Sequence, residues 1–226
     1  MVWNGDNFVL ECRGAVKRLG IPGIRFVDGP GGCVSGHGTA FPVSMARGAT
    51  GNEALEERVG EAIGEEVREQ GGNLFGGVCI NLPRHPAWGR IQETYSDQPV
   101  LLGSLGAALT RGVRRHAMAC VKHFACNSME NARFKVDVKV DEATFHEVYG
   151  PHFKTAIDAG ADAVMTAYNS VNGEYCGQNA WLIRQTLRKD WGFTGIVAYD
   201  IVWGLRAVTK SEKAGIHLEE PVQHKR

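Results

Sequence analysis

The sequence predicts an α/β fold, a TIM-like (β/α)8 barrel, with the completeness of its two ends left open. Short apolar runs alternate with longer helix-like stretches, which implies a parallel sheet joined by right-handed crossovers. Six or seven runs qualify as parallel strands, a number that fits a barrel of about eight strands better than a dinucleotide-binding sheet. No GxGxxG follows the first strand, which also disfavours a dinucleotide site.

The first half of the chain provides three strand candidates and two helices. Residues 52–70 are a predicted helix because apolar residues recur at a spacing of four from Leu55 to Val67, through Val59 and Ile63. Gly71 and Gly72 end it. The remaining segments are strands at 23–27, 41–46 and 77–82, a loop at 83–97 and a helix at 99–114.

The second half repeats the pattern. Residues 134–140 alternate with period two, which indicates a half-exposed strand outside the main barrel. Asp141 is a predicted N-cap for a helix that runs to Ala159. The other segments are strands at 117–124, 161–168, 195–200 and 214–219, and a helix at 179–191.

Composition excludes several classes of protein. The 226 residues carry 25 basic and 25 acidic side chains, and this balance disfavours a nucleic-acid partner. No run of about 18 apolar residues is present, so no membrane span is expected. The first residues lack the pattern of a secretion signal, and we therefore expect a cytoplasmic protein. The six cysteines are scattered and predict reduced thiols, with no metal site.

Nearly every predicted strand ends in a polar or charged residue, and in a barrel those ends share one rim. Each of these residues has a local alternative: a turn residue, a helix N-cap, a satisfied ion pair or a core aromatic. Together they predict a sugar site, since charged groups bind hydroxyls strongly and aromatics support a sugar face. The residues are Asp28, Lys122, His123, Met165, Tyr168, Asp200, Glu219 and Glu220, with Trp88 and Arg90 in the loop at 84–93.

Seven motifs in order resemble the N-terminal catalytic barrel of glycoside hydrolase family 3, the β-glucosidase family. They include DGPGG after Val27, KHFACN from Lys122, MTAYNSVNG from Met165 and WGFTGIVAYD ending at Asp200. The full set lies at residues 27–32, 81–93, 95–99, 122–133, 165–173, 191–200 and 214–221. The resemblance covers about residues 19–221, so residues 1–226 are expected to be one such domain.

The resemblance implies a retaining β-glucosidase with Asp200 as the nucleophile. It implies that Asp28, Arg90, Lys122 and His123 bind the sugar hydroxyls and that Met165 and Tyr168 line the same subsite. The expected partner is a β-glucoside or oligosaccharide, without a cofactor. A barrel that lacks elements would expose apolar surface, so a homo-oligomer is a further expectation.

The sequence also departs from the family pattern. The acid/base glutamate of the family usually comes from a second α/β domain, which we expect to be absent here together with the acid/base. The single-domain N-acetylglucosaminidase branch of the family has the motif KHFPGHG. In this sequence Ala125 and Cys126 follow KHF instead, which disfavours that branch. Two alternatives stay open: a non-catalytic or decayed sugar-binding barrel, and a lyase that uses Lys122 as a Schiff base.

Overall fold

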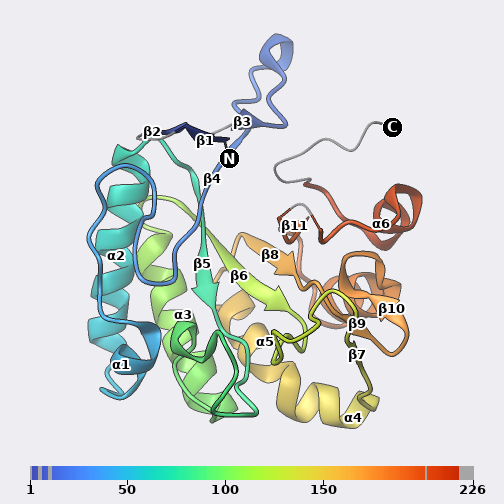
Figure 1. Ribbon diagram of the computed structural model, residues 1–226. Coiled ribbons are helices and arrows are strands. Elements are labelled where there is room, and N and C mark those ends of the chain that lie inside the picture. Colours follow the sequence, from blue (N-terminus) through green and yellow to red (C-terminus); the bar gives the residue numbers. More distant parts are fainter. Residues whose placement is uncertain (1, 5–6, 10–11, 202, 219–226) are drawn as a thin grey trace.

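A curled, mostly parallel sheet forms the centre of the protein (Figure 1). The structure is a computed structural model that describes residues 2–4, 7–9, 12–201 and 203–218. The strand order is β11-β8-β6-β5-β4-β3, and only β3 (Cys12–Arg13) runs antiparallel to its neighbour. The parallel strands are β4 (Ile24–Val27), β5 (Leu74–Cys79), β6 (Met118–Phe124), β8 (Ala163–Thr166) and β11 (Ile196–Tyr199).

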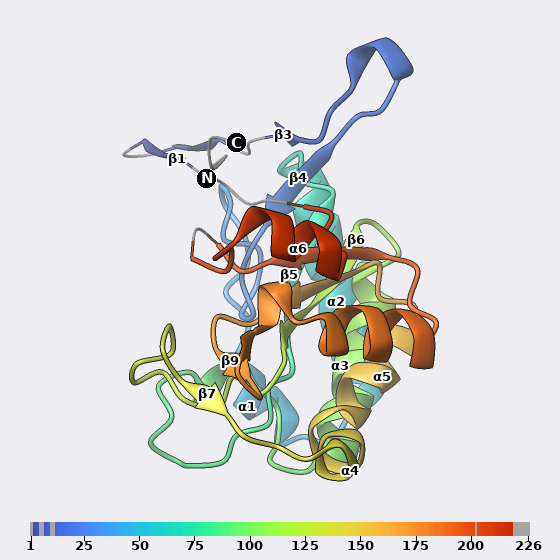
Figure 2. The same ribbon diagram turned by 90° about the vertical axis from the view of Figure 1, so that its right-hand side faces the viewer.

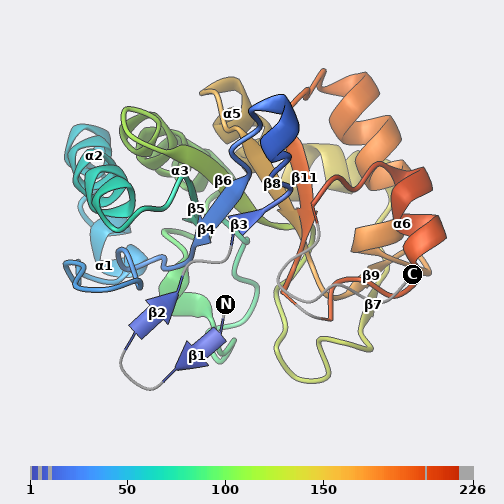
Figure 3. The ribbon, with the colours of Figure 1, turned by 90° about the horizontal axis from the view of Figure 1, so that it is seen from above.

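Helices cover the outer face of this sheet, and seen from above the sheet curls away from them (Figure 3). Two of them are π-helices, η3 (Phe145–Tyr149) and η5 (Trp181–Asp190). The α-helices are α1 (Ser44–Gly48), α2 (Glu53–Glu69), α3 (Pro99–Val113), α4 (Glu142–Thr144), α5 (Pro151–Asp158) and α6 (Val208–Ala214). Three single 3₁₀ turns are η1 (Lys17–Leu19), η2 (Ile91–Glu93) and η4 (Cys176–Gln178).

Two small sheets stand apart from the main one. β1 (Val2–Asn4) pairs with β2 (Asn7–Val9). β7 (Asp137–Val138), β9 (Ser170–Val171) and β10 (Glu174–Tyr175) form the second sheet, which lies below α6 and away from both termini in Figure 2. The half-exposed strand expected at 134–140 therefore lies outside the main sheet, as predicted, but it is only two residues long.

Side chains that alternate along the parallel strands build two apolar layers. One set packs under the helices and includes Val27, Phe75 and Val121. The neighbouring positions point into the curl, where Phe26, Leu74, Cys120, Ala163, Met165, Ala198 and Leu218 form a second cluster. This division into an outer and an inner apolar layer is the one a barrel wall requires.

The predicted helix at 52–70 is confirmed by α2. Asn52 caps it by accepting a hydrogen bond from the Leu55 backbone N–H at 3.0 Å. Val59, Ile63 and Val67 are buried as the spacing predicts, whereas Leu55 is 38% exposed, so the buried stripe begins one turn later than expected.

Glycines allow α2 and α3 to approach each other closely. A Cβ on Gly112 would lie 2.1 Å from the Glu57 carbonyl oxygen, and one on Gly60 would lie 2.6 Å from the Leu109 carbonyl oxygen. Because both obstacles are backbone atoms, the helices must separate to accept a methyl group. Gly112→Ala should therefore destabilise the fold by about 1–3 kcal/mol, despite the better helix propensity of alanine.

Chemical denaturation of the Gly112→Ala variant checks this expectation. Val100 lies on the same helix and is 86% exposed, so Val100→Ala is the matched control and should change stability by less than about 0.5 kcal/mol. Equal stabilities of the two variants would contradict the close-packing argument.

Three sequence predictions need correction. The strand predicted at 41–46 is wrong, because α1 begins at Ser44 and the Arg47 side chain folds back to the carbonyls of Pro30 and Pro42. The strand predicted at 77–82 begins three residues earlier, at Leu74. In the segment predicted as a strand at 214–219, α6 extends to Ala214 and Leu218 alone forms a parallel bridge, to Ala198.

The described residues form part of a barrel wall. Five parallel strands and the Leu218 bridge make a half-barrel, and an eight-stranded barrel is not shown. Glu219 and Glu220 lie outside the described residues. The thiols of Cys33, Cys79, Cys126 and Cys176 are buried and form no disulfide, as expected. None of the helices in the described ranges is long and apolar enough to cross a membrane.

Candidate active site

The predicted site residues gather where the parallel strands end. Asp28 directly follows β4, Lys122 and His123 lie near the C-terminal end of β6, and Asp200 directly follows β11. Since these strands are parallel, their carboxyl ends share one edge of the sheet. Met165 on β8 lies in register with Lys122 on one side and Ala198 on the other.

A buried ion pair joins two of these strands. The Lys122 Nζ lies 2.5 Å from the Asp28 Oδ1, and the lysine side chain is only 2% exposed. Burial has the largest single effect and lowers the pKa of Lys122, but the Asp28 carboxylate and the nearby Cys79 together act against it, and the pKa is raised. The ammonium group therefore keeps its proton. This protonation disfavours the alternative in which Lys122 acts as a Schiff-base nucleophile.

Asp200 lies in a dry, positively charged environment. Its Oδ1 accepts a hydrogen bond from the Ile201 backbone N–H at 2.8 Å, and its Oδ2 lies 3.7 Å from the His123 Nε2. Burial raises the pKa of Asp200 to about 6, although Lys122 and Arg90 act in the opposite direction. Among the described residues no donor reaches Oδ2, so this oxygen keeps its lone pairs for another group.

This environment predicts the pH dependence of any reaction in which Asp200 attacks. Only the ionised carboxylate is nucleophilic, so the rate should rise as the pH increases through about 6 and then level off. The rate of covalent labelling, measured with an activated glucoside from about pH 4 to about pH 8, tests this prediction. A rate that is already constant at about pH 4.5 would show that the carboxylate ionises normally.

His123 is held on one side by Asn81. The Asn81 Oδ1 lies 2.9 Å from the His123 backbone nitrogen and 2.7 Å from its Nδ1, and the Asn81 Nδ2 donates to the His123 carbonyl at 2.8 Å. Burial lowers the pKa of His123 well below its usual value, and the charges of Arg90, Lys122 and Arg133 lower it further. The imidazole is therefore neutral at physiological pH.

Arg90 is oriented by a bidentate ion pair with Glu93, whose two oxygens lie 2.9 and 2.7 Å from the Arg90 Nε and Nη2. Both residues lie in the loop after β5, where Glu93 is the last residue of the 3₁₀ turn η2. Arg90 is close enough to Asp200 to influence its pKa, so the structure places this guanidinium at the same edge as the strand-end residues.

Tyr168 and Met165 lie at different depths. The Tyr168 hydroxyl donates to the Ile201 carbonyl at 2.6 Å, and burial together with the Asp200 charge raises its pKa. Met165 is 2% exposed and belongs to the inner apolar cluster, so in the described chain it underlies the site.

Arg133 is a candidate that strand-end reasoning missed. Its guanidinium lies 4.7 Å from the centre of the Tyr168 ring and 5.0 Å from that of Phe134. Glu130 holds it at 2.8 Å and accepts a hydrogen bond from the Trp88 indole N–H at 3.1 Å. The only sequence signal was its place at the end of the family motif at residues 122–133, since residues 126–136 have no regular secondary structure.

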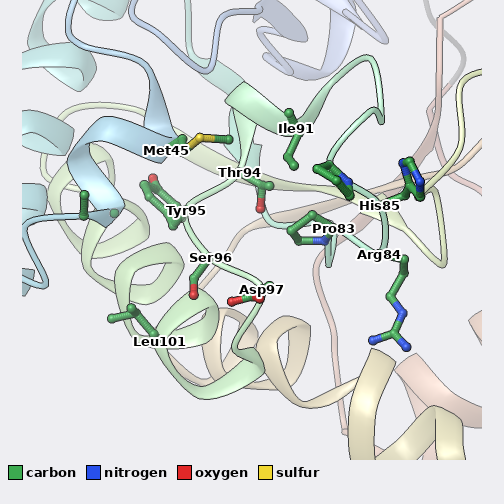
Figure 4. A pocket seen from close by; sticks show the side chains of 13 residues that line it. Met45, Pro83, Arg84, His85, Ile91, Thr94, Tyr95, Ser96, Asp97 and Leu101 are labelled. Atoms are coloured by element: carbon green, nitrogen blue, oxygen red, sulfur yellow. The ribbon is translucent and has the colours of Figure 1, made fainter.

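A pocket of about 450 Å³ is lined in part by the loop between β5 and α3 (Figure 4). Its walls come from α1, from the start of α3 and from the loop, with Tyr95, Thr94 and Asp97 around its centre in the figure. None of the predicted site residues lines it. Across the described ranges, no group of three ligating side chains is close enough to hold a metal ion.

The protein is an α/β half-barrel whose parallel strands present carboxylates and cations at their carboxyl ends. Residues 6–222 match the family model described as the glycosyl hydrolase family 3 N-terminal domain. This chain therefore belongs to glycosyl hydrolase family 3. The resemblance inferred from the seven motifs is confirmed.

The chain is also similar in sequence to known β-glucosidases. The chain is 37% identical to a β-glucosidase from Rhizobium radiobacter, with 92% of this chain and 26% of that protein aligned. It is 36% identical to thermostable β-glucosidase B from Acetivibrio thermocellus, covering 92% of this chain and 30% of the relative. The chain thus spans between a quarter and a third of the length of these relatives.

Solved structures agree. β-Glucosidase 3B from Thermotoga neapolitana, in complex with glycerol, superimposes with a TM-score of 0.87 at 39% identity, over 91% of this chain and 30% of that one. A family 3 β-glucosidase from Bifidobacterium adolescentis gives a TM-score of 0.89 at 32% identity, over 92% of this chain and 32% of that one.

Proposed function

We propose that this chain carries the nucleophile and the glycone-binding residues of a retaining β-glucosidase. In this proposal the Asp200 carboxylate attacks the anomeric carbon of a terminal β-D-glucosyl residue and forms a covalent glycosyl-enzyme. The observation that carries the proposal is the convergence of Asp200, Lys122, Asp28 and Arg90, from distant parts of the chain, at one edge of the sheet. The names of the relatives point to the same substrate class.

Each charged group has a role that its surroundings support. Lys122, Asp28, Arg90 and His123 would bind the sugar hydroxyls, because charge-assisted hydrogen bonds to hydroxyls are strong in a dry site. The charges of Lys122 and Arg90 favour ionised Asp200 against the effect of burial. Tyr168 would line the same subsite, with Met165 supporting it from below. We further propose that the half-barrel is part of a (β/α) barrel.

The proton donor for the leaving group is proposed to come from outside the described residues. Three carboxylates of the described strand ends and loops are each engaged by a cation: Asp28 by Lys122, Glu93 by Arg90 and Glu130 by Arg133. A carboxylate paired in this way is a poor general acid, because its partner stabilises the ionised form. Loss of general acid catalysis slows unactivated substrates by about 10²–10⁴-fold.

An activated glucoside tests the proposal, because its leaving group needs no proton. A 2-deoxy-2-fluoro-β-D-glucoside with a dinitrophenolate leaving group should add one fluoroglucosyl group to the chain, and peptide mass spectrometry should locate it on Asp200. Excess glucose should slow the labelling. Unactivated alkyl glucosides should react far more slowly than activated ones.

The same experiment distinguishes the proposed function from the alternative of a decayed sugar-binding barrel. That alternative predicts protection of the chain by glucose, visible as a higher melting temperature, without any covalent adduct. Labelling of another residue would contradict the assignment of Asp200.

A further inference from the structure

The contacts of Asn81 determine which nitrogen of His123 carries the proton. We propose that Asn81 is a positioning residue that fixes His123 in the Nδ1–H tautomer, so that Nε2 presents a lone pair to a hydroxyl group of the substrate. The inference about Asn81 and the tautomer stands on the contacts alone, and its role in catalysis rests on the proposed function.

The backbone of His123 sets the orientation of the Asn81 amide. The amide oxygen faces the His123 N–H at 2.9 Å and the amide nitrogen faces the His123 carbonyl at 2.8 Å. If the amide were flipped, its N–H would face the backbone N–H of His123 and its oxygen would face the backbone carbonyl. Both contacts are unfavourable for groups that are about 1% exposed. The amide orientation is therefore determined by the backbone.

The orientation of the amide in turn determines the tautomer. The atom of Asn81 that lies 2.7 Å from the His123 Nδ1 is the same oxygen, Oδ1, which can only accept. The imidazole must therefore donate from Nδ1. Because the ring is buried among the cations Lys122, Arg90 and Arg133, it stays neutral and its Nε2 carries no proton.

The strand geometry explains why a side chain makes these contacts. The pairing of β6 with β8 shifts register between Lys122 and Phe124, so His123 lies at an irregular position of the ladder. The Asn81 amide pairs with its backbone as a neighbouring strand would. The Thr94 hydroxyl holds the backbone of Asn81, because it donates a hydrogen bond to the Asn81 backbone carbonyl oxygen at 2.8 Å.

The consequence for chemistry is that His123 accepts at Nε2. This nitrogen lies 3.7 Å from the Asp200 Oδ2, and two lone pairs then face each other. In this tautomer His123 gives no hydrogen bond to the Asp200 Oδ2. A sugar hydroxyl at this place could donate to Nε2.

Long-range ¹H–¹⁵N correlation NMR on the full chain labelled with ¹⁵N-histidine reads the tautomer directly. His123→Gln identifies the signal among the eight histidines. We expect the native chain to show protonated Nδ1 and unprotonated Nε2. The opposite pattern for His123 in the native chain would overturn the inference.

Two variants of Asn81 form a matched pair. Asn81→Asp retains an oxygen acceptor and should keep the Nδ1–H pattern, with a higher pKa of His123 because of the added charge. Asn81→Leu removes the acceptor and should shift the ring toward Nε2–H. Labelling of Asp200 by the fluoroglucoside should slow by about 10–100-fold in Asn81→Leu and recover in part in Asn81→Asp.

Thr94→Val is the control for a purely structural effect. It removes the hydrogen bond to the Asn81 backbone, so it should lower stability without changing the His123 tautomer. A tautomer that stays Nδ1–H in a folded Asn81→Leu variant would contradict the positioning role. If the native tautomer is Nδ1–H but Asp200 is never labelled, the proposed function fails and the assignment of the tautomer stands.

Discussion

A chain with asparagine in place of Asp200 should resist labelling by every activated glucoside and should unfold at a higher temperature than the native chain. The first effect follows from chemistry. An amide cannot attack the anomeric carbon, so the labelling rate should fall by at least about 10⁴-fold. Mass spectrometry after prolonged incubation checks this loss.

The second effect follows from the buried charge. The Asp200 pKa is about 6 in the folded chain, above its value of 3.8 in the unfolded chain. The folded state thus holds the proton more tightly, and this group makes stability fall as the pH rises from about 4 to about 6. At neutral pH the penalty is about 2–3 kcal/mol, which the neutral amide removes.

The position of His123 adds to this expectation. The amide nitrogen of the asparagine would face the lone pair of the His123 Nε2, where the native carboxylate oxygen lies at 3.7 Å. The stability gain should therefore be largest above about pH 6 and vanish near about pH 4. Asp97 is an exposed carboxylate that lines the pocket formed in part by the loop between β5 and α3, and Asp97→Asn should change neither labelling nor stability. A destabilised Asp200→Asn variant at neutral pH would refute the burial argument.

Loss of the Asp28 carboxylate should weaken the fold more than any surface charge change. Asp28→Asn leaves the Lys122 ammonium, 2% exposed, without its counter-charge. Breaking a buried pair in this way costs about 3–5 kcal/mol, and somewhat less here because Asp28 is 31% exposed. Urea unfolding of the variant, compared with the native chain, measures this loss.

The pH dependence of this variant carries a distinct sign. Without Asp28, burial dominates and the pKa of Lys122 in the folded chain falls below its unfolded value. The unfolded state then binds the proton more tightly, so the stability of Asp28→Asn should rise with pH between the folded and the unfolded pKa of Lys122 and level off above the unfolded value.

A second substitution and a surface pair serve as controls. Asp28→Asn combined with Lys122→Met removes both charges and should recover much of the stability lost in the single variant. The pair of Lys154 and Asp158 is exposed on α5, so Asp158→Asn should change stability by less than about 1 kcal/mol. Additive effects of the two substitutions at Asp28 and Lys122 would mean that the ion pair is not coupled.

Local patterns in the sequence predicted most of the fold. The four-residue spacing in α2, the period-two alternation before Asp141 and the Asp141 N-cap all correspond to observed structure. The boundaries of β5 were wrong because residues 74–82 are a continuous buried run, in which alternation gives no register. The apolar residues at 41–46 suggested a strand, but the contacts of Arg47 with distant carbonyls direct the chain into α1.

The site was predictable only in part. Asp28, Lys122, His123 and Asp200 could be found because each ends a strand, and parallel strands bring their ends together. Asn81 and Glu130 could not be assigned roles, because their partners, His123 and Trp88, each lie 42 residues away and no periodicity connects them. Side-chain hydrogen bonds between segments leave no local pattern in a sequence.

The curl of the sheet, and not the loops, determines how far apart the strand-end residues lie. Lys122 and Asp28 end β6 and β4, whereas Asp200 ends β11 on the far side of β8, so the rolled backbone sets the reach between them. Loops after the strands can therefore change in sequence and length while the relative positions of these three side chains persist. Under the proposed function, changes in those loops would alter the preferred sugar and leave the type of reaction unchanged.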